Sequence, residues 1–144
     1  MLQWTLVALA LLAWPLGAAA EPVARVALHV DENDPQTMKI ALNNAQNIQD
    51  YYDEQGEEVE IAVIANGPGL HMFLAEGSPV GDRIEQMSLA IPTISFQACG
   101  NTHAAMTRQN NGVAPELLAE VEMIPSGAVQ LIELQQDGWA YLRP

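Results

Sequence analysis

The sequence predicts an α/β protein in which helices cover both faces of a five-stranded, mainly parallel sheet. Strand-like and helix-like segments alternate along the chain, which is typical of right-handed crossovers between parallel strands. The strand-like segments are dense apolar runs, as expected for strands that are buried on both faces. Proline near the starts of the helix-like segments, and glycine or asparagine near their ends, mark their boundaries.

The first strand and the first helix are clearly marked. Residues 23–30, VARVALHV, form a valine-rich run that predicts a buried strand. Asp34 and Pro35 then combine a favoured N-cap residue with a proline that suits the first helical turn. Apolar residues recur at helical spacing as far as Tyr52, and Gly56 is expected to end this helix.

The middle of the chain repeats this alternation. Residues 58–65, EVEIAVIA, predict the second strand, and residues 66–69, NGPG, predict a sharp loop after it. A short apolar segment, residues 70–75, comes before a helix that residues 78–79, Ser-Pro, are expected to open. Residues 91–98 predict the third strand, which tolerates a proline near its start.

The last third of the chain predicts two further helices and two short strands. The segment at residues 100–102, Gly-Asn-Thr, is expected to begin a helix that ends at residues 110–112, Asn-Asn-Gly. Residues 120–124 predict the fourth strand. A helix is expected to start at residues 125–127, Pro-Ser-Gly, and to lead into a last strand at residues 139–142.

The composition excludes several classes of protein. The chain has 144 residues and a formal net charge of −13, and all of its charged side chains follow Ala20. Such a surface repels the phosphates of nucleic acids and the headgroups of anionic lipids. A single cysteine excludes a disulfide framework and a Cys-x-x-Cys redox or zinc centre. Residues 21–144 contain no internal repeat and no linker, so we expect one domain.

Residues 1–20 are expected to form a signal peptide. Leu6–Trp14 is a compact apolar core, Pro15 and Gly17 interrupt the helix, and the alanines at 18–20 suit cleavage before Glu21. An uncleaved membrane anchor is the alternative. Cleavage predicts a mature acidic domain in the periplasm, with no membrane contact after the signal peptide is removed.

Chemically useful side chains follow the predicted strands at their carboxyl ends, where parallel sheets bind their ligands. The loop of residues 66–69 could cradle an anion with its amides, although a simple tight turn is the commoner structure. A histidine at a strand end is more often a structural hydrogen-bonding group than a ligand. The candidate ligand-binding residues at this edge are Asn33, Asn66, Gly67, His71, Gly100, Asn101, Ser126 and Gly127.

Cys99 lies between the third strand and the helix that follows it. Free amides and a partial positive charge at a helix N-terminus favour the thiolate, which is the reactive form of cysteine. Asn101 or Thr102 is expected to cap this helix, and His103 to supply charge or a hydrogen bond to the sulfur. The alternative is that Cys99 is a small buried apolar residue without chemistry. A metal centre made of His29, His71, His103 and Cys99 is a further alternative, which no local ligand spacing supports.

Three segments make the chain resemble a known family. They are DENDPQTMKIALNNAQNIQDYYDEQGEEVEIAVIANGPGLHMFL, ISFQACGNTHAAM and MIPSGAVQLIELQQDGWAYLRP. Together they resemble the DsrE/DsrF-like family, and in particular its exported single-domain branch, over residues 26–144. The resemblance implies a three-layer α/β/α sandwich that assembles into trimers or hexamers. Cytoplasmic members carry sulfane sulfur as a persulfide on a cysteine at a strand end, which by position is Cys99. This chain departs from those members because we expect it to be exported.

Three hypotheses follow for the function. The first is a periplasmic sulfur carrier that holds sulfane sulfur as a persulfide on Cys99, a sulfurtransferase-like role that needs no cofactor. Because the chain has no second cysteine, the acceptor must be another protein or a small thiol. The second is a non-catalytic, oligomeric module that binds a small ligand at the same edge. The third is a protein that binds a metal through histidine and Cys99.

Overall fold

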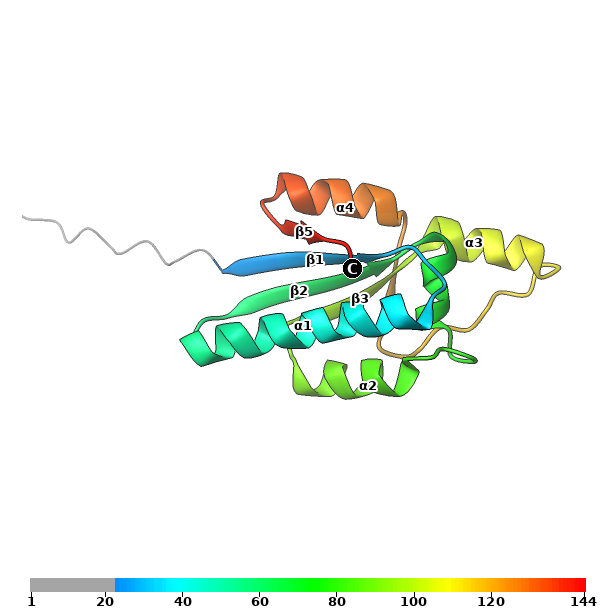
Figure 1. Ribbon diagram of the computed structural model, residues 1–144. Helices are drawn as coiled ribbons and strands as arrows, with labels where there is room; N and C mark the ends of the chain where they lie inside the picture. Colours follow the sequence, from blue (N-terminus) through cyan, green and yellow to red (C-terminus); the bar gives the residue numbers. More distant parts are fainter. Residues whose placement is uncertain (1–22) are drawn as a thin grey trace, which may run out of the picture.

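The computed structural model describes residues 23–144, which form a five-stranded sheet with helices on both faces (Figure 1). The predicted signal peptide lies outside the described residues. The strands are β1 (Ala24–Val30), β2 (Val59–Ala65), β3 (Ile94–Cys99), β4 (Val121–Ile124) and β5 (Ala140–Leu142). The helices are α1 (Pro35–Gln55), the 3₁₀ helix η1 (Gly67–Phe73), α2 (Gly81–Ala90), α3 (Gly100–Gln109) and α4 (Gly127–Gln136). None of the helices in this part of the chain has the length and apolar character that a membrane crossing requires.

The strand order is β4-β3-β2-β1-β5, and every neighbouring pair is parallel. The chain moves in one direction from β1 to β4 and then returns past β1 to form β5. Because crossovers between parallel strands are right-handed, this reversal puts α4 on the face opposite α1 and α2 (Figure 1). The predicted three-layer α/β/α sandwich with a five-stranded parallel sheet is confirmed.

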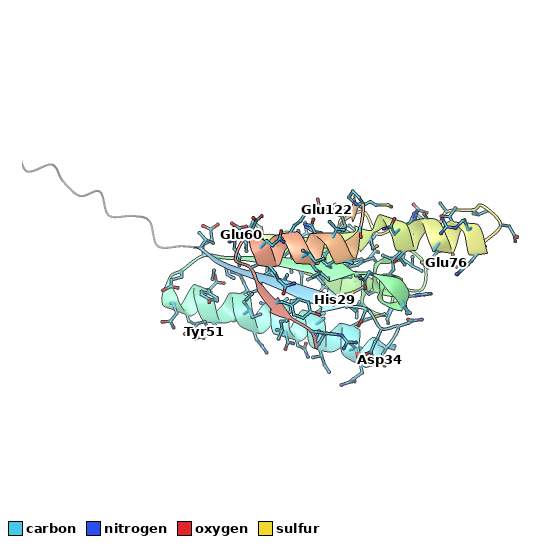
Figure 2. All side chains as sticks on the ribbon, turned by 90° about the horizontal axis from the view of Figure 1, so that it is seen from above. His29, Asp34, Tyr51, Glu60, Glu76 and Glu122 are labelled. Carbon is cyan, nitrogen blue, oxygen red and sulfur yellow. The ribbon has the colours of Figure 1, made fainter. Side chains whose placement is uncertain are left out.

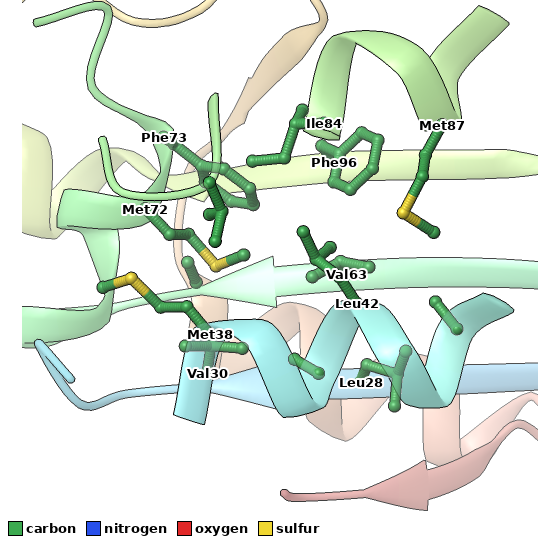
Figure 3. Close-up of a cluster of buried hydrophobic side chains, with 14 of the residues drawn as sticks. Leu28, Val30, Met38, Leu42, Val63, Met72, Phe73, Ile84, Met87 and Phe96 are labelled. Atoms are coloured by element: carbon green, nitrogen blue, oxygen red, sulfur yellow. The ribbon is translucent and has the colours of Figure 1, made fainter. Parts of the chain in front are cut away.

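The larger core lies between the sheet and the helices α1 and α2 (Figure 3). Asp34 begins α1, because its carboxylate accepts hydrogen bonds from the amide and the hydroxyl of Thr37, both at 2.8 Å. Gly56 ends α1 in the left-handed conformation at φ 70°. The buried side chains recur at helical spacing and fill the space above the sheet. They include Leu28, Val30, Met38, Leu42, Val63, Phe73, Ile84 and Phe96.

The opposite face of the sheet has a smaller core. Leu131 of α4 packs there against Ala27, Ala62 and Ile64, with Leu134 and Trp139 partly buried at the margin. The remaining large apolar side chains of α4, Val129 and Ile132, are about half exposed, at 49% and 54%. Within the described residues, α4 therefore covers this face, whereas α1, α2 and η1 cover the other.

Several element boundaries differ from those that the sequence predicts. The third strand begins at Ile94 instead of Ile91, because residues 91–93 form a turn closed by a 3.2 Å hydrogen bond from Ile94 N to Ile91 O. The helix expected at Ser78 begins at Gly81, since the Ser78 hydroxyl donates to the carbonyl oxygen of Met72. Most of the expected loop and apolar segment, residues 67–73, form η1.

Hydrogen bonds from two arginines connect the segments around β5 to β1 and the loop after it. Arg25 donates to the carbonyl oxygen of Asp137 at 2.7 Å, just before β5. Arg143 donates to Asp31 Oδ1 from Nε at 3.0 Å and from Nη2 at 2.9 Å, just after β5. These contacts place the end of β5 beside the carboxyl end of β1, where the candidate site lies.

Candidate functional site

Cys99 is the last residue of β3 and the N-cap residue of α3. Its side chain is 4% exposed. The sequence places the sulfur correctly at the strand-to-helix junction, but the helix begins two residues earlier than a cap at Asn101 would allow, and three residues earlier than a cap at Thr102. The free amides of the first turn therefore surround the sulfur itself.

Backbone amides at the starts of α3 and α4 act on the pKa of this sulfur. Burial raises the pKa of the Cys99 thiol, but the hydrogen bonds from the amides of Gly127, Thr102 and Asn101 and from the Thr102 hydroxyl outweigh it. The pKa of Cys99 therefore lies below its ordinary value. Since a lower pKa increases the fraction of thiolate at neutral pH, the site favours the nucleophilic form.

Two glycines allow this close approach of α4 to α3. A Cβ atom on Gly127 would lie 3.3 Å from Cys99 Cβ and 3.1 Å from Asn66 Cβ, which is tighter than ordinary contact. A Cβ atom on Gly100 would lie 2.9 Å from the carbonyl oxygen of Ile124. The amide of Gly127 reaches the sulfur because neither position carries a side chain.

Thr102 links the sulfur to the start of η1. Its hydroxyl oxygen accepts a 2.9 Å hydrogen bond from the Gly67 amide. The same hydroxyl lowers the pKa of the Cys99 thiol. Because its oxygen accepts from the Gly67 amide, its proton remains available to the sulfur.

A second chain of hydrogen bonds approaches Cys99 from β5. The Tyr141 hydroxyl and His29 Nδ1 lie 2.8 Å apart, and His29 Nε2 lies 3.0 Å from Asn66 Oδ1. Figure 2 shows His29 on the sheet face close to β5. The amide nitrogen of Asn66 lies 3.5 Å from the position of a Gly127 Cβ. Asn66 and Cys99 thus face each other across the space that a side chain at Gly127 would fill.

A cleft of about 440 Å³ lies next to the sulfur, between η1 and α3. Thr102 and Gly67 separate it from Cys99, which does not line it. Although the chain has 18 acidic residues, none of them lines this cleft. The lining residues are Gly67, Pro68, His71, Asn101, Thr102, Ala105, Met106 and Gln109.

The structure corrects the expected role of His103. Its Nε2 lies 2.8 Å from the carbonyl oxygen of Pro115, in the loop before β4. Because α3 begins at Gly100, the amides of residues 101 and 102 are the ones that act on the sulfur. The His103 side chain contacts the loop before β4 instead. The neighbours of the sulfur are Thr102 and Gly127, and His103 is a structural residue that holds the loop.

The structure does not bring the three histidines and Cys99 together. His29 contacts Tyr141 and Asn66, and His71 Nδ1 lies 3.0 Å from the carbonyl oxygen of Pro68. Among residues 23–144, no group of three or more histidine, cysteine or acidic side chains is arranged to hold a metal ion. The metal-binding hypothesis therefore has no geometric support in this part of the chain.

The other predicted ligand-binding residues fall into two groups. Gly67, His71 and Asn101 line the cleft, and Asn66, Gly100 and Gly127 shape the surroundings of Cys99. Two residues take no part in either. Asn33 is exposed in the loop before α1, and the Ser126 hydroxyl accepts a 3.4 Å hydrogen bond from Val129 N as the N-cap of α4.

Sequence reasoning missed Tyr141 and the direct contact of Thr102 with the sulfur. Thr102 follows the cysteine by three residues, which is the spacing of a helix N-cap and N3, so a cap at Cys99 would have revealed it. Tyr141 is 112 residues from His29, and no local signal predicts this contact.

The chain was compared with protein families, with curated proteins and with solved structures. No family model and no curated protein matches it. It is similar to the structure of MTH1491 from Methanobacterium thermoautotrophicum, a protein of unknown function, at 27% sequence identity. The match covers 84% of this chain and 99% of that chain, with a TM-score of 0.71. The similarity supports the fold, and it does not indicate an activity because the function of the matched protein is unknown.

Proposed function

We propose that this protein is a periplasmic sulfur carrier of the DsrE/DsrF-like type, which holds sulfane sulfur as a persulfide on Cys99. The observation that carries the proposal is that the amides of Gly127, Asn101 and Thr102 and the Thr102 hydroxyl lower the pKa of Cys99, although the residue is buried at the junction of β3 and α3. A buried cysteine that serves only for packing does not require such donors. A thiolate does require them, because burial without hydrogen bonds penalises its charge.

The transfer needs no cofactor and no change in overall oxidation state. The Cys99 thiolate attacks the terminal sulfur of a donor persulfide, R–S–SH. The new S–S bond forms as the donor S–S bond breaks, and the electron pair leaves with the donor as R–S⁻. An acceptor thiolate then attacks the outer sulfur of Cys99–S–SH, and Cys99 leaves as a thiolate. Because the chain has one cysteine, the acceptor is a second protein or a small thiol.

The test is the intact mass of the protein after incubation with polysulfide. The wild type should gain about 32 mass units per sulfur atom, and Cys99→Ser should gain none, because persulfidation requires a reactive thiolate. Treatment with a small thiol should then remove the added mass. A native wild type that gains no sulfur, while the denatured chain does, would contradict the proposal and show that Cys99 is a packing residue.

A second candidate function is the binding of a small ligand in the cleft between η1 and α3. The cleft favours this alternative because Cys99 does not line it, so a ligand could bind there without meeting the thiol. Ligand binding would protect Met106 and His71 in the wild type and in Cys99→Ser equally. Sulfur transfer, in contrast, disappears in Cys99→Ser, so this variant separates the two functions.

The proposal includes export and assembly. The signal peptide at residues 1–20 and a periplasmic location follow from the sequence alone, and sequencing the N-terminus of exported protein tests them. A homo-oligomer, trimeric or hexameric, follows from the family resemblance. It is supported by apolar side chains that α4 and β5 leave partly exposed, namely Val129, Ile132, Tyr141 and Leu142.

A further inference from the structure

We propose that Tyr141 and His29 act as positioning residues, which hold the Asn66 side chain with its amide group turned toward Cys99, where it donates a hydrogen bond to the outer sulfur of the persulfide. This inference rests on the proposed sulfur-carrier function and adds a device for holding the transferred atom. Neither Tyr141 nor His29 touches the sulfur.

The direction of the Asn66 side chain follows from the hydrogen bonds of His29. An amide oxygen only accepts hydrogen bonds, so His29 Nε2, 3.0 Å from Asn66 Oδ1, must carry a proton. In the neutral ring Nδ1 then has a lone pair, and it accepts from the Tyr141 hydroxyl at 2.8 Å. The Asn66 oxygen thus fits the Nε2–H tautomer of His29, and the Tyr141 hydroxyl satisfies the lone pair that this tautomer leaves on Nδ1.

The other end of the amide faces the cysteine. Asn66 Nδ2 lies 3.5 Å from the position of a Gly127 Cβ, and Cys99 Cβ lies 3.3 Å from the same position. In the resting protein no hydrogen bond within the described residues uses the Asn66 NH₂ group. A persulfide extends one sulfur atom beyond Cys99, and its negative charge requires a donor there. The amides of Gly127 and Thr102 already lower the pKa of the resting Cys99 thiol.

The charged side chains next to the hydrogen bonds of Tyr141, His29 and Asn66 form ion pairs with one another. Asp31 lies two residues after His29, and Arg143 lies two residues after Tyr141. Arg143 and Asp31 form an ion pair at 2.9 Å. Arg143 also contacts Glu32 at 3.0 Å. The charged residues that follow β1 and β5 therefore pair with one another, and the residue that follows β2, Asn66, is neutral. The Tyr141 hydroxyl is therefore the hydrogen-bond partner of His29 Nδ1 at this position.

The experiment compares two pairs of variants. Tyr141→Phe removes only the hydroxyl, and Tyr51→Phe is its control, because Tyr51 is exposed on α1 away from the site. Asn66→Asp replaces the donor NH₂ by an oxygen and adds a negative charge. Its control is Asn47→Asp, which adds the same charge on the exposed side of α1. All four are tested as complete chains for persulfide yield after incubation with polysulfide.

We expect Tyr141→Phe to lower the persulfide yield about threefold, because His29 Nδ1 loses the hydrogen-bond partner that holds the ring in place. Asn66→Asp should lower it about tenfold or more, because a carboxylate would then face the persulfide anion. Ring nitrogen chemical shifts of His29 provide an independent measurement: they should show the Nε2–H tautomer in the wild type and a mixture in Tyr141→Phe. The two control variants should match the wild type.

Three results would overturn the inference. A wild-type protein that gains no sulfur overturns the proposed function and this inference with it. A wild type that gains sulfur, beside a Tyr141→Phe variant that matches Tyr51→Phe, overturns this inference alone. A wild-type His29 ring with its proton on Nδ1 also overturns it, even if Asn66→Asp fails to fold.

Discussion

The backbone amide of Gly127, the first residue of α4, lies against Cys99, the last residue of β3, and lowers the pKa of its thiol. This contact depends on the absence of a side chain at Gly127, whose Cβ would lie 3.3 Å from Cys99 Cβ. Two helix N-termini, those of α3 and α4, therefore converge on one sulfur. Each brings free amides and the positive end of a helix dipole, which favour a thiolate.

The first prediction concerns the pH dependence of the reaction of Cys99. Because the hydrogen bonds to the sulfur hold its pKa below the ordinary value, alkylation of the native protein should have a midpoint below about 8.5, the value of an unperturbed thiol. The measurement is the rate of reaction with a small haloacetamide against pH. A bulky maleimide should react much more slowly, since the side chain is 4% exposed. A midpoint above that of the denatured chain would contradict the prediction.

The same shift predicts how stability changes with pH. Between the folded and the unfolded pKa of Cys99, the unfolded chain binds more protons than the native protein, so this group stabilises the native state as the pH rises. Its contribution is complete above the unfolded pKa and disappears as the pH falls through the folded pKa. The free energy of unfolding of the wild type, relative to Cys99→Ser, should therefore increase as the pH rises from below the folded pKa of Cys99 to above the unfolded value of about 8.5. Urea titrations at several pH values measure this difference, and a difference that falls as the pH rises would show that burial dominates.

Thr102 provides a matched pair of variants at the sulfur. Thr102→Val keeps the shape but removes the hydroxyl that accepts from Gly67 N and lowers the pKa of Cys99. A hydrogen bond to a charged group contributes about 1.5–3 kcal/mol, so alkylation of Thr102→Val at pH 7 should be about tenfold slower or more. Thr102→Ser retains the hydroxyl and should react like the wild type. Equal rates for the two variants would show that the threonine hydroxyl does not act on the sulfur.

The local patterns of the sequence were sufficient to predict the fold class. Dense apolar runs predicted β1 and β2 to within one residue, because a strand buried on both faces leaves an uninterrupted run of apolar side chains. The helical spacing of Met38, Leu42 and Ala45 predicted the buried face of α1, which the structure confirms. The strand order was beyond such patterns, because pairs such as Val26 and Ala140 are distant in the sequence.

The site was predicted in part. The position of Cys99 at the end of β3 followed from the strand pattern, but its neighbours depended on where α3 begins. A shift of the helix start changes which side chains of the first turn face the sulfur, and this is why His103 was assigned in error. The hydrogen bond between His29 and Tyr141 requires β5 to pair with β1, which the sequence alone did not show.

Gly69 gives a prediction for the loop that follows β2. A Cβ atom on Gly69 would clash with the backbone of β1, at 2.6 Å from Val30 C and 2.9 Å from Asp31 Cα. Because backbone cannot move aside like the end of a side chain, Gly69→Ala should lower the free energy of unfolding by about 3 kcal/mol or more. Gly81→Ala is the control, since its Cβ would make ordinary contacts at 3.5 Å with Leu118 and Ser78. If the two variants are equally stable in urea, the result would contradict the close contact between Gly69 of η1 and the end of β1.

The last prediction concerns assembly. Ile132 is 54% exposed on α4, the one helix that covers its face of the sheet. If copies of the chain meet through this helix, Ile132→Glu should break the assembly, because it would bury a carboxylate between chains that each carry a net charge of −13. Light scattering at micromolar concentration should give at least a trimer for the wild type and a smaller species for Ile132→Glu.

Leu89→Glu is the control, because Leu89 is 80% exposed on α2, on the opposite face. A wild type of about 13–14 kDa, the mass of one copy of residues 21–144, would contradict assembly altogether. A Leu89→Glu variant that dissociates in place of Ile132→Glu would instead locate the contact on the α2 side of the sheet.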